Sequence, residues 1–337
     1  MLVGITYDLR SAYLAQGYGE EETAEFDRDD TIEAIDAALQ SLGHQTVRIG
    51  NIRDLVSRLA AGESWDLVFN ICEGLRGAGR ESQVPALLEA YNIPVTFSDS
   101  SLMALCLNKA WTKAVLGDAV PTPDYLTITS VDQLANIELR LPLFMKPLSE
   151  GTGKGVTSKS VIRDLALLRS QCEYLLHTYQ QPVLVETYLP GREFTVSILG
   201  TGQDAAVLGT FEIILLANAE AEVYGYLNKE ESEERVQNLL VDPMSDPVVA
   251  KAEARALTAW RLLGCRDAGR IDMRCDDLGE PSFVEVNPLA GINPGHSDLP
   301  MLATAIGMEY VELIRLIVES AATRICLSVD QSVQQVA

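Results

Sequence analysis

The chain has 337 residues, of which 47% are hydrophobic and 22% charged, as expected for a globular protein of two or three domains. Its formal net charge of −22 argues against a nucleic-acid partner, because phosphate contacts need clustered Lys and Arg. No apolar run is long enough to span a bilayer, so we expect no membrane partner.

The cysteines and histidines favour a cytoplasmic protein without a zinc centre. Six cysteines are scattered with no Cys-x-x-Cys pair, which is typical of reduced thiols rather than of a disulfide framework. With only three histidines, a histidine-based metal site is not favoured. The first residues read as an apolar strand without a basic leader, so we expect no signal peptide.

Strand and helix patterns alternate over the first hundred residues. We expect strands at 2–7, 45–49, 65–70 and 93–97, and helices at 32–42, 52–61 and 82–91. This alternation predicts a parallel sheet covered by helices, whose ligands bind beyond the carboxyl ends of the strands. Tyr7, Asp8, Asn70 and Glu73 lie at such ends.

A glycine-rich segment follows in the second region. Helices are expected at 108–116 and 164–179, and strands at 125–128, 141–147 and 183–186. The strand at 141–147 leads Lys146 into a segment with glycines at 151, 153 and 155, whose backbone N–H groups can approach an anion; Lys154 adds charge. It is not a Walker A loop, because Gly155 follows the Gly-Lys pair and 156–157 reads as strand. Alone, this motif leaves phosphate binding open.

The third region contains a candidate metal hairpin. Antiparallel strands are expected at 193–199 and 205–214, a mobile acidic segment at 217–242, and a helix at 246–263. The strands 269–275 and 282–287 flank a turn, and Glu285 and Asn287 share one face that Asp272 can approach. Such oxygen donors suit Mg²⁺, although a solvated polar face is an equal alternative. The Gly- and Pro-rich loop 288–300 favours function, and a helix at 310–322 precedes a loose tail.

These signals occur in one order that closely resembles the ATP-grasp superfamily and, within it, the D-alanine–D-alanine ligases. The resemblance covers about residues 68–322 and is most specific at 269–300. Its motifs are Lys109, Lys146 before the glycine-rich segment, Glu186-Thr187-Tyr188-Leu189, Glu193-Phe194-Thr195-Val196, Gly269-Arg270-Ile271-Asp272, Glu285-Val286-Asn287 and His296-Ser297.

The resemblance implies an α/β (α+β overall) ATP-grasp fold of three domains. They are an N-terminal parallel α/β pre-ATP-grasp domain at 1–107, a central α+β lid domain with the glycine-rich loop at 108–189, and a C-terminal α+β catalytic domain with an antiparallel sheet and the Mg²⁺ site at 190–325; a tail occupies 326–337. ATP would lie between the central and C-terminal domains, and the resemblance suggests a homodimer.

The resemblance also implies roles for individual residues. The ATP phosphates would be held by Lys109, Lys146, Lys229, Gly151, Thr152 and Gly153. The adenine hinge and the ribose ligand would be Glu186, Tyr188, Leu189 and Glu193. Two Mg²⁺ ions, which Mn²⁺ can replace, would be bound by Asp272, Glu285 and Asn287. The catalytic residues would be Arg270, Gly291 and Ser297, with Arg270 and the Gly291 backbone stabilising a tetrahedral intermediate.

The chain departs from the family where amino acids are bound. Tyr7-Asp8-Leu9-Arg10 replaces a Gly-Gly-x-Ser-x-Glu signature, Glu73 replaces a histidine, Glu230 replaces a tyrosine, and Asp298 replaces an apolar residue. A negative charge at residue 298 would repel a substrate carboxylate unless a cation offsets it. We assign substrate contacts to Asp8, Glu73, Tyr226, His296, Ser297 and Asp298.

The function expected from these residues is that of an ATP-dependent carboxylate–amine ligase acting on small amino-acid or carboxylate substrates. It would form an acyl phosphate that an amine attacks, releasing ADP and phosphate. Two alternatives stay open. One is a specialised ligase that joins an amino acid to a non-peptide natural-product precursor, as in mycosporine biosynthesis; the other is an ATP-binding protein without catalysis.

Overall fold

The first sheet of the protein is parallel, as predicted. The computed structural model describes residues 1–334. Its N-terminal sheet has the order β2 (Gln45–Gly50), β1 (Leu2–Tyr7) and β3 (Leu67–Ile71). Helix α2 (Asp29–Ser41) packs on one face, and α3 (Ile52–Ala60) and α4 (Gln83–Ala90) pack on the other. The sheet is thus covered on both sides, which its apolar strands require.

A four-stranded antiparallel sheet follows in the chain. Its order is β4 (Tyr125–Ile128), β7 (Val183–Thr187), β5 (Leu143–Pro147) and β6 (Val161–Ile162). Helix α7 (Leu165–Tyr179), whose first turn is capped by the Asp164 side chain, packs its apolar residues against this sheet. Helices α5 (Ser100–Leu107) and α6 (Lys109–Leu116) connect it to the first sheet.

The third sheet is five-stranded and antiparallel. Its order is β10 (Val236–Val241), β9 (Ala206–Leu215), β8 (Glu193–Leu199), β11 (Ala268–Cys275) and β12 (Pro281–Asn287). Helix α10 (Pro247–Leu263) covers it and ends at Gly264, which adopts a left-handed conformation with a φ of 78°. The wholly buried Trp260 anchors this helix to the sheet.

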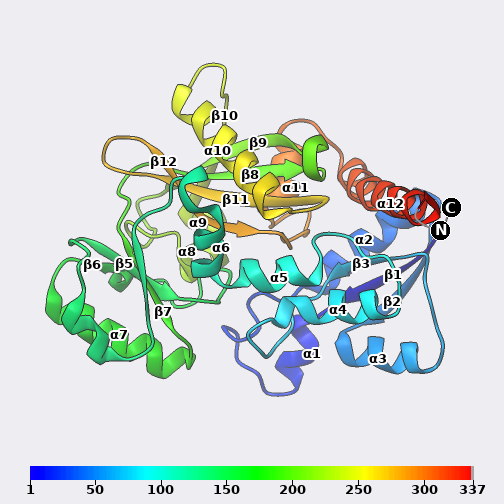
Figure 1. Ribbon diagram of the computed structural model, residues 1–337, viewed down its shortest axis with the longest axis horizontal. Coiled ribbons are helices and arrows are strands. Elements are labelled where there is room, and N and C mark those ends of the chain that lie inside the picture. Colours follow the sequence, from blue (N-terminus) through cyan, green and yellow to red (C-terminus); the bar gives the residue numbers. More distant parts are fainter. Residues whose placement is uncertain (335–337) are drawn as a thin grey trace.

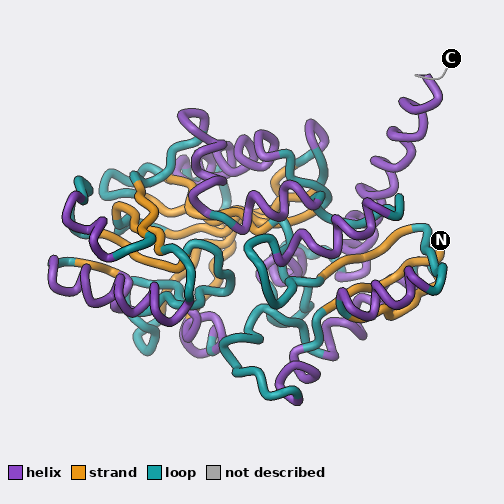
Figure 2. Tube along the Cα trace, turned by 60° about the horizontal axis from the view of Figure 1, so that its bottom comes forward, coloured by secondary structure: helices purple, strands orange, loops and turns teal. Residues whose placement is uncertain are grey.

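The last helix returns to the first sheet. Helix α11 (Asp298–Ala305) precedes α12 (Tyr310–Gln334), which lies beside the N-terminal strands in Figure 1 and extends beyond the rest of the chain in Figure 2. Apolar residues of α12 join the core of the N-terminal sheet. The buried Asp267 accepts a hydrogen bond from the Phe97 backbone N–H at 2.7 Å and pairs with Arg324 at 2.5 Å. The first and last segments therefore share one core.

Four sequence expectations about local structure are wrong. Residues 93–97 make one bridge, Val68 to Val95, instead of a strand, since Pro94 lacks an N–H and Phe97 has a φ of 66°. Residues 156–157 are not a strand. The segment 217–242, expected to be mobile, contains the short helices α8 (Tyr226–Glu230) and α9 (Ser232–Arg235) and then β10, because pairing with β9 outweighs its weak periodicity. Residues 326–334 of the expected loose tail continue α12, and 335–337 lie outside the described residues.

The polar segment 9–28, which follows β1, includes the short helix α1 (Arg10–Ala15). No helix in residues 1–334 combines the length and apolar character that crossing a membrane requires. The three sheets follow one another as the sequence indicates, and the boundaries at 107, 189 and 325 stay predictions.

Candidate functional site

The hairpin of β11 and β12 brings the three predicted metal ligands together. Antiparallel pairing sets Asp272 opposite Glu285, with Asn287 opposite Arg270. The Asn287 amide donates to Asp272 Oδ2 at 3.3 Å, and the Thr195 hydroxyl donates to Asp272 Oδ1 at 2.7 Å. No group of three His, Cys, Asp or Glu side chains within residues 1–334 could hold a metal alone. A cation here would therefore need the amide oxygen of Asn287, phosphate oxygens and water, all of which suit Mg²⁺.

Two lysines converge on the same carboxylate. Lys109 Nζ lies 3.5 Å and Lys146 Nζ lies 3.9 Å from Glu285 Oε2. Burial opposes ionisation of Glu285, but the neighbouring cations, Lys109 first, hold its pKa well below the ordinary value. Lys109 also donates to the Glu150 carbonyl at 2.5 Å, at the start of the glycine-rich loop. Two ammonium groups thus lie beside one predicted metal ligand, an arrangement that suits the binding of an anion.

A third lysine, which the sequence analysis missed, completes this network. Lys113 is one helical turn after Lys109 on α6, and its side chain is 0% exposed. Its ammonium lies 2.8 Å from Glu186 Oε1, while Lys146 lies 3.3 Å from Glu186 Oε2. Burial lowers the pKa of Lys113, and Glu186 partly offsets that effect. The i, i+4 spacing of the two lysines on a predicted helix was the available signal.

A cavity between the four-stranded and five-stranded sheets holds most of the residues that the resemblance assigned to the nucleotide. Its walls include Phe144, Lys146, Gly153, Glu186, Tyr188, Leu189, Glu193, Lys229, Asp272 and Glu285. The sequence analysis missed Arg274, which pairs with Glu193 at 3.1 Å and lies 5.3 Å from the centre of the Tyr188 ring. Burial raises the pKa of Glu193, although Arg274 opposes the shift.

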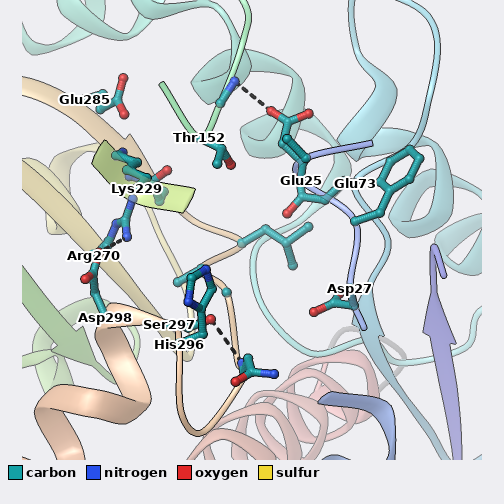
Figure 3. Close-up of a pocket in the computed structure, with 18 of the residues that line it drawn as sticks. Glu25, Asp27, Glu73, Thr152, Lys229, Arg270, Glu285, His296, Ser297 and Asp298 are labelled. Atoms are coloured by element: carbon teal, nitrogen blue, oxygen red, sulfur yellow. Dashed lines mark hydrogen bonds and ion pairs between the residues drawn. The ribbon is translucent and has the colours of Figure 1, made fainter. Parts of the chain in front are cut away.

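The second cavity adjoins the first and shares Lys109, Lys229 and Glu285 with it. Its walls hold the remaining predicted residues Glu73, Gly151, Thr152, Arg270, Asn287, Gly291, His296, Ser297 and Asp298. Figure 3 shows Arg270, Asp298 and Lys229 on one side of this cavity and Glu25, Asp27 and Glu73 on the other. Tyr226 and Asp8 line neither cavity. Instead Tyr224 lines both, with the Lys229 ammonium 4.7 Å from its ring centre.

The N-terminal side of this second cavity is acidic. Asp8, which does not line the cavity, is already engaged, because it accepts hydrogen bonds from the Tyr13 hydroxyl at 2.6 Å and from the Gly74 backbone N–H at 2.9 Å. Burial, with a contribution from Asp8, raises the pKa of Asp27 to about 8. Burial also raises the pKa of Glu73 well above its ordinary value. Burial thus disfavours the charged form of both carboxyls.

The glycine-rich loop is held from both sides. Gly153 has a φ of 69°, and a Cβ there would lie 2.8 Å from the backbone of Gly225, so the loop can touch the start of α8 only with glycine. On the other side, Glu25 accepts from the Gly151 N–H at 2.6 Å and pairs with Lys154 at 2.9 Å and with Arg80 at 2.8 Å. We call the side chains of Glu25, Arg80 and Lys154 the clasp. Lys154, whose charge the sequence analysis expected to attract an anion, instead pairs with Glu25 within the protein.

The loop after β12 is tightly folded against α11. A Cβ on Gly291 would lie 2.6 Å from the Ser297 hydroxyl oxygen, which accepts from the Asn293 N–H at 3.1 Å. Arg270, whose Nε lies 3.6 Å from Asp272 Oδ1, also contacts the Asp298 carboxylate through Nη1. Arg270 is therefore the cation that offsets the negative charge of Asp298.

Known proteins share this sequence and fold. The family described as D-ala D-ala ligase C-terminus matches residues 117–319. The D-alanine–D-alanine ligase of Bordetella petrii is 34% identical over 276 residues, covering 81% of this chain and 80% of that protein. That of Bordetella avium is 32% identical over 277 residues, covering 81% and 83%. The crystal structure of the ligase from Bacillus anthracis complexed with ATP matches with a TM-score of 0.71 at 22% identity, covering 96% of this chain and 98% of that one. These similarities confirm the resemblance and the predicted ATP-grasp fold.

Proposed function

The chain belongs to the D-alanine–D-alanine ligase family, an ATP-dependent group that forms C–N bonds, and from this premise we propose that it joins a small carboxylate to the amine of a small amino acid or a related acceptor. The single observation that carries the proposal is the convergence of Lys109 and Lys146 on Glu285, opposite Asp272. Those charges suit the binding of a polyphosphate and its metal, which every such ligase needs.

The residues present fit ATP and Mg²⁺. Asp272, Glu285 and Asn287 would hold the metal, which we take to be two Mg²⁺ ions that Mn²⁺ can replace. When bound, the metal neutralises phosphate charge. Lys109 and Lys146 would bind the phosphates, and the cavity beside Tyr188 and Leu189 would take the nucleoside.

The chemistry follows from what surrounds this face. A substrate carboxylate attacks the terminal phosphoryl group to give an acyl phosphate, and an amine then attacks its carbonyl carbon. The oxyanion that develops needs a fixed cation, and Arg270 lies beside Asp272 on β11. The glycine-rich loop borders both cavities, where it would exclude water from the hydrolysis-prone acyl phosphate.

A specialised ligase with a non-peptide acceptor is the second candidate. The presence of Glu73, Glu230 and Asp298 on the walls of the second cavity favours it, because these residues change the charge that a substrate meets. Cytoplasmic location and a homodimer remain part of the proposal. They rest on the free buried thiols and on the resemblance, respectively.

The test is phosphate release from Mg-ATP across single amino acids and pairs, with product masses measured in parallel. Release stimulated by D-alanine, together with D-alanyl-D-alanine, would assign the ordinary family reaction. Release that needs other amino acids or a further acceptor would assign the specialised one. The Glu285→Gln variant is the matched control. Equal ADP release with and without every acceptor amine would refute both.

A further inference from the structure

Asp298 is a buried carboxylate that does not cap its own helix, α11. It is the first residue of α11, yet Ser297 and not Asp298 occupies the N-cap position, and no side chain caps this helix. Its side chain is 9% exposed. One oxygen contacts the Arg270 guanidinium, and the other accepts a hydrogen bond from the Asn238 amide at 3.3 Å. The side chain is therefore directed at the cavity wall formed by β10 and β11.

The cations beside this wall, Arg270 and Lys229, are not available to bind a ligand carboxylate. Arg270 contacts Asp298 directly and lies 3.6 Å from Asp272, so Asp298 alone already offsets its one charge when Asp272 holds the metal. Lys229, the other cation near this wall, forms no ion pair among the described side chains, but it also lines the nucleotide cavity, where phosphates would engage it. A ligand carboxylate at this wall would have to displace Asp298 from Arg270 and leave it buried with the neutral Asn238 amide as its remaining partner, which is unfavourable for a buried charge.

The acceptor is the substrate that meets this wall. The carboxylate substrate must place its reacting group at the metal face, next to Asp272. Arg270 turns its Nε toward Asp272 and its Nη1 toward Asp298, so Asp298 lies on the side of the guanidinium away from that face. An amine that attacks the activated carbonyl beside Arg270 would therefore bring its neighbouring substituent close to Asp298.

We propose that Asp298 determines acceptor specificity, and that the acceptor carries an uncharged hydrogen-bond donor, such as an amide, where a free amino acid carries its carboxylate. The inference rests on the proposed ligase function. In the transfer step the acceptor nitrogen forms the C–N bond as the carbonyl C–O bond to phosphate breaks. Inorganic phosphate leaves with the electron pair, and the amine loses one proton to water. The Asp298 oxygens accept hydrogen bonds from the amide of the acceptor.

Paired acceptors that differ at one group test this directly. Glycine is compared with glycinamide, and each enantiomer of alanine with its alaninamide, using each amino acid of the panel as donor with Mg-ATP. The measured quantity is the ratio of kcat/KM for amide over acid, from phosphate release and product mass. We expect a ratio of about ten or more for the wild-type protein and a fall of about tenfold in Asp298→Asn, since one discriminating contact is worth about a factor of ten.

The matched control is Asp277→Asn, which changes an exposed acid in the turn between β11 and β12 and should leave the ratio unchanged. If Asp298→Asn fails to fold, Asn238→Ala removes the other partner of the same carboxylate, and the wild-type ratio stands as a test by itself. A wild-type preference for free acids, or an unchanged ratio in a folded Asp298→Asn protein, would overturn this inference alone. Absence of phosphate release with every acid and amide would overturn the proposed function and this inference with it.

Discussion

Replacing Glu25 by glutamine should loosen the glycine-rich loop from the N-terminal part of the protein. The clasp joins segments 126 residues apart in the sequence, because Glu25 bonds the Gly151 N–H. Its three charged side chains are almost fully buried, with exposures of 6% for Glu25, 8% for Arg80 and 8% for Lys154. Burial opposes ionisation of Glu25, but Arg80 and Lys154 outweigh it and lower the pKa of the carboxyl.

The magnitude follows from the loss of one partner in a buried ion cluster. Glutamine keeps an oxygen for the Gly151 N–H but turns an amide N–H₂ group toward two cations. Removing one partner of a buried pair typically costs about 3–5 kcal/mol. If about 3 kcal/mol of this cost falls on loop opening, the open population rises by roughly 100-fold, since about 1.4 kcal/mol corresponds to a factor of ten.

Hydrogen exchange read by mass spectrometry measures that population directly. Peptides covering residues 149–155 should lose roughly 100-fold of their protection in Glu25→Gln, whereas peptides from β1 and β3 should not. Glu22→Gln, three residues earlier and exposed, is the matched control. A double-mutant cycle with Lys154→Met should show an interaction energy above about 0.5 kcal/mol. Unchanged loop protection, or strictly additive effects of the two substitutions, would refute the clasp.

Three further outcomes are expected. Lys113→Met leaves the buried Glu186 with Lys146 alone and should lower the free energy of unfolding by about 3 kcal/mol in urea, while the double variant Lys113→Met/Glu186→Met should recover part of it. A double variant no more stable than the single one would contradict this. Glu285→Gln should weaken Mg²⁺-dependent ATP turnover by at least about 10–100-fold, and EDTA should abolish wild-type turnover until Mg²⁺ is restored. The pKa of Asp27 is about 8 in the folded protein against 3.8 in the unfolded chain. Its contribution to the stability of the folded protein is therefore fully present below pH 3.8 and is lost as the pH rises through 8. Asp27→Asn should therefore stabilise the protein at pH 9 relative to pH 5 by at least about 1.4 kcal/mol, one pKa unit, and an equal effect at both values would count against the assignment.

The hairpin of β11 and β12 could be predicted because its information is local. Alternation of polar and apolar residues and a turn containing Gly279 define the strands, and the two-residue period then places Glu285 and Asn287 on one face. The ATP-grasp fold followed because several such local motifs occur in a fixed order. The shared core of α12 and the N-terminal sheet could not be predicted in this way, since it depends on packing between the two ends of the chain.

The clasp and the Lys113 site escaped prediction for a different reason. Nothing in the sequence near Glu25 indicates that its partner is a backbone N–H far along the chain, because a glutamate in an acidic stretch reads as a solvated charge. Lys113 was missed because a lysine on a helix is normally exposed, and its complete burial is tolerable because it pairs with Glu186 and donates to the Phe283 carbonyl at 3.3 Å. Similarly, the sequence does not show that Tyr224, just before α8, lines both cavities while Tyr226, the first residue of α8, lines neither.

The two cavities differ in how their charges are balanced, and this difference explains which part of the function the sequence revealed. In the first cavity, Glu186 and Glu285 each form ion pairs with lysines, so the charges there are balanced within the chain itself. Such a balance is typical of a ligase that binds a polyphosphate. On the opposite wall, no ion pair among the described side chains involves Asp27 or Glu73, and burial raises the pKa of both. Their charge depends on protons and on the ligand rather than on sequence. The reaction class could therefore be predicted from the motifs and their order, whereas the substrate, in our proposal, depends on the three-dimensional setting of a few carboxyls, Asp298 among them.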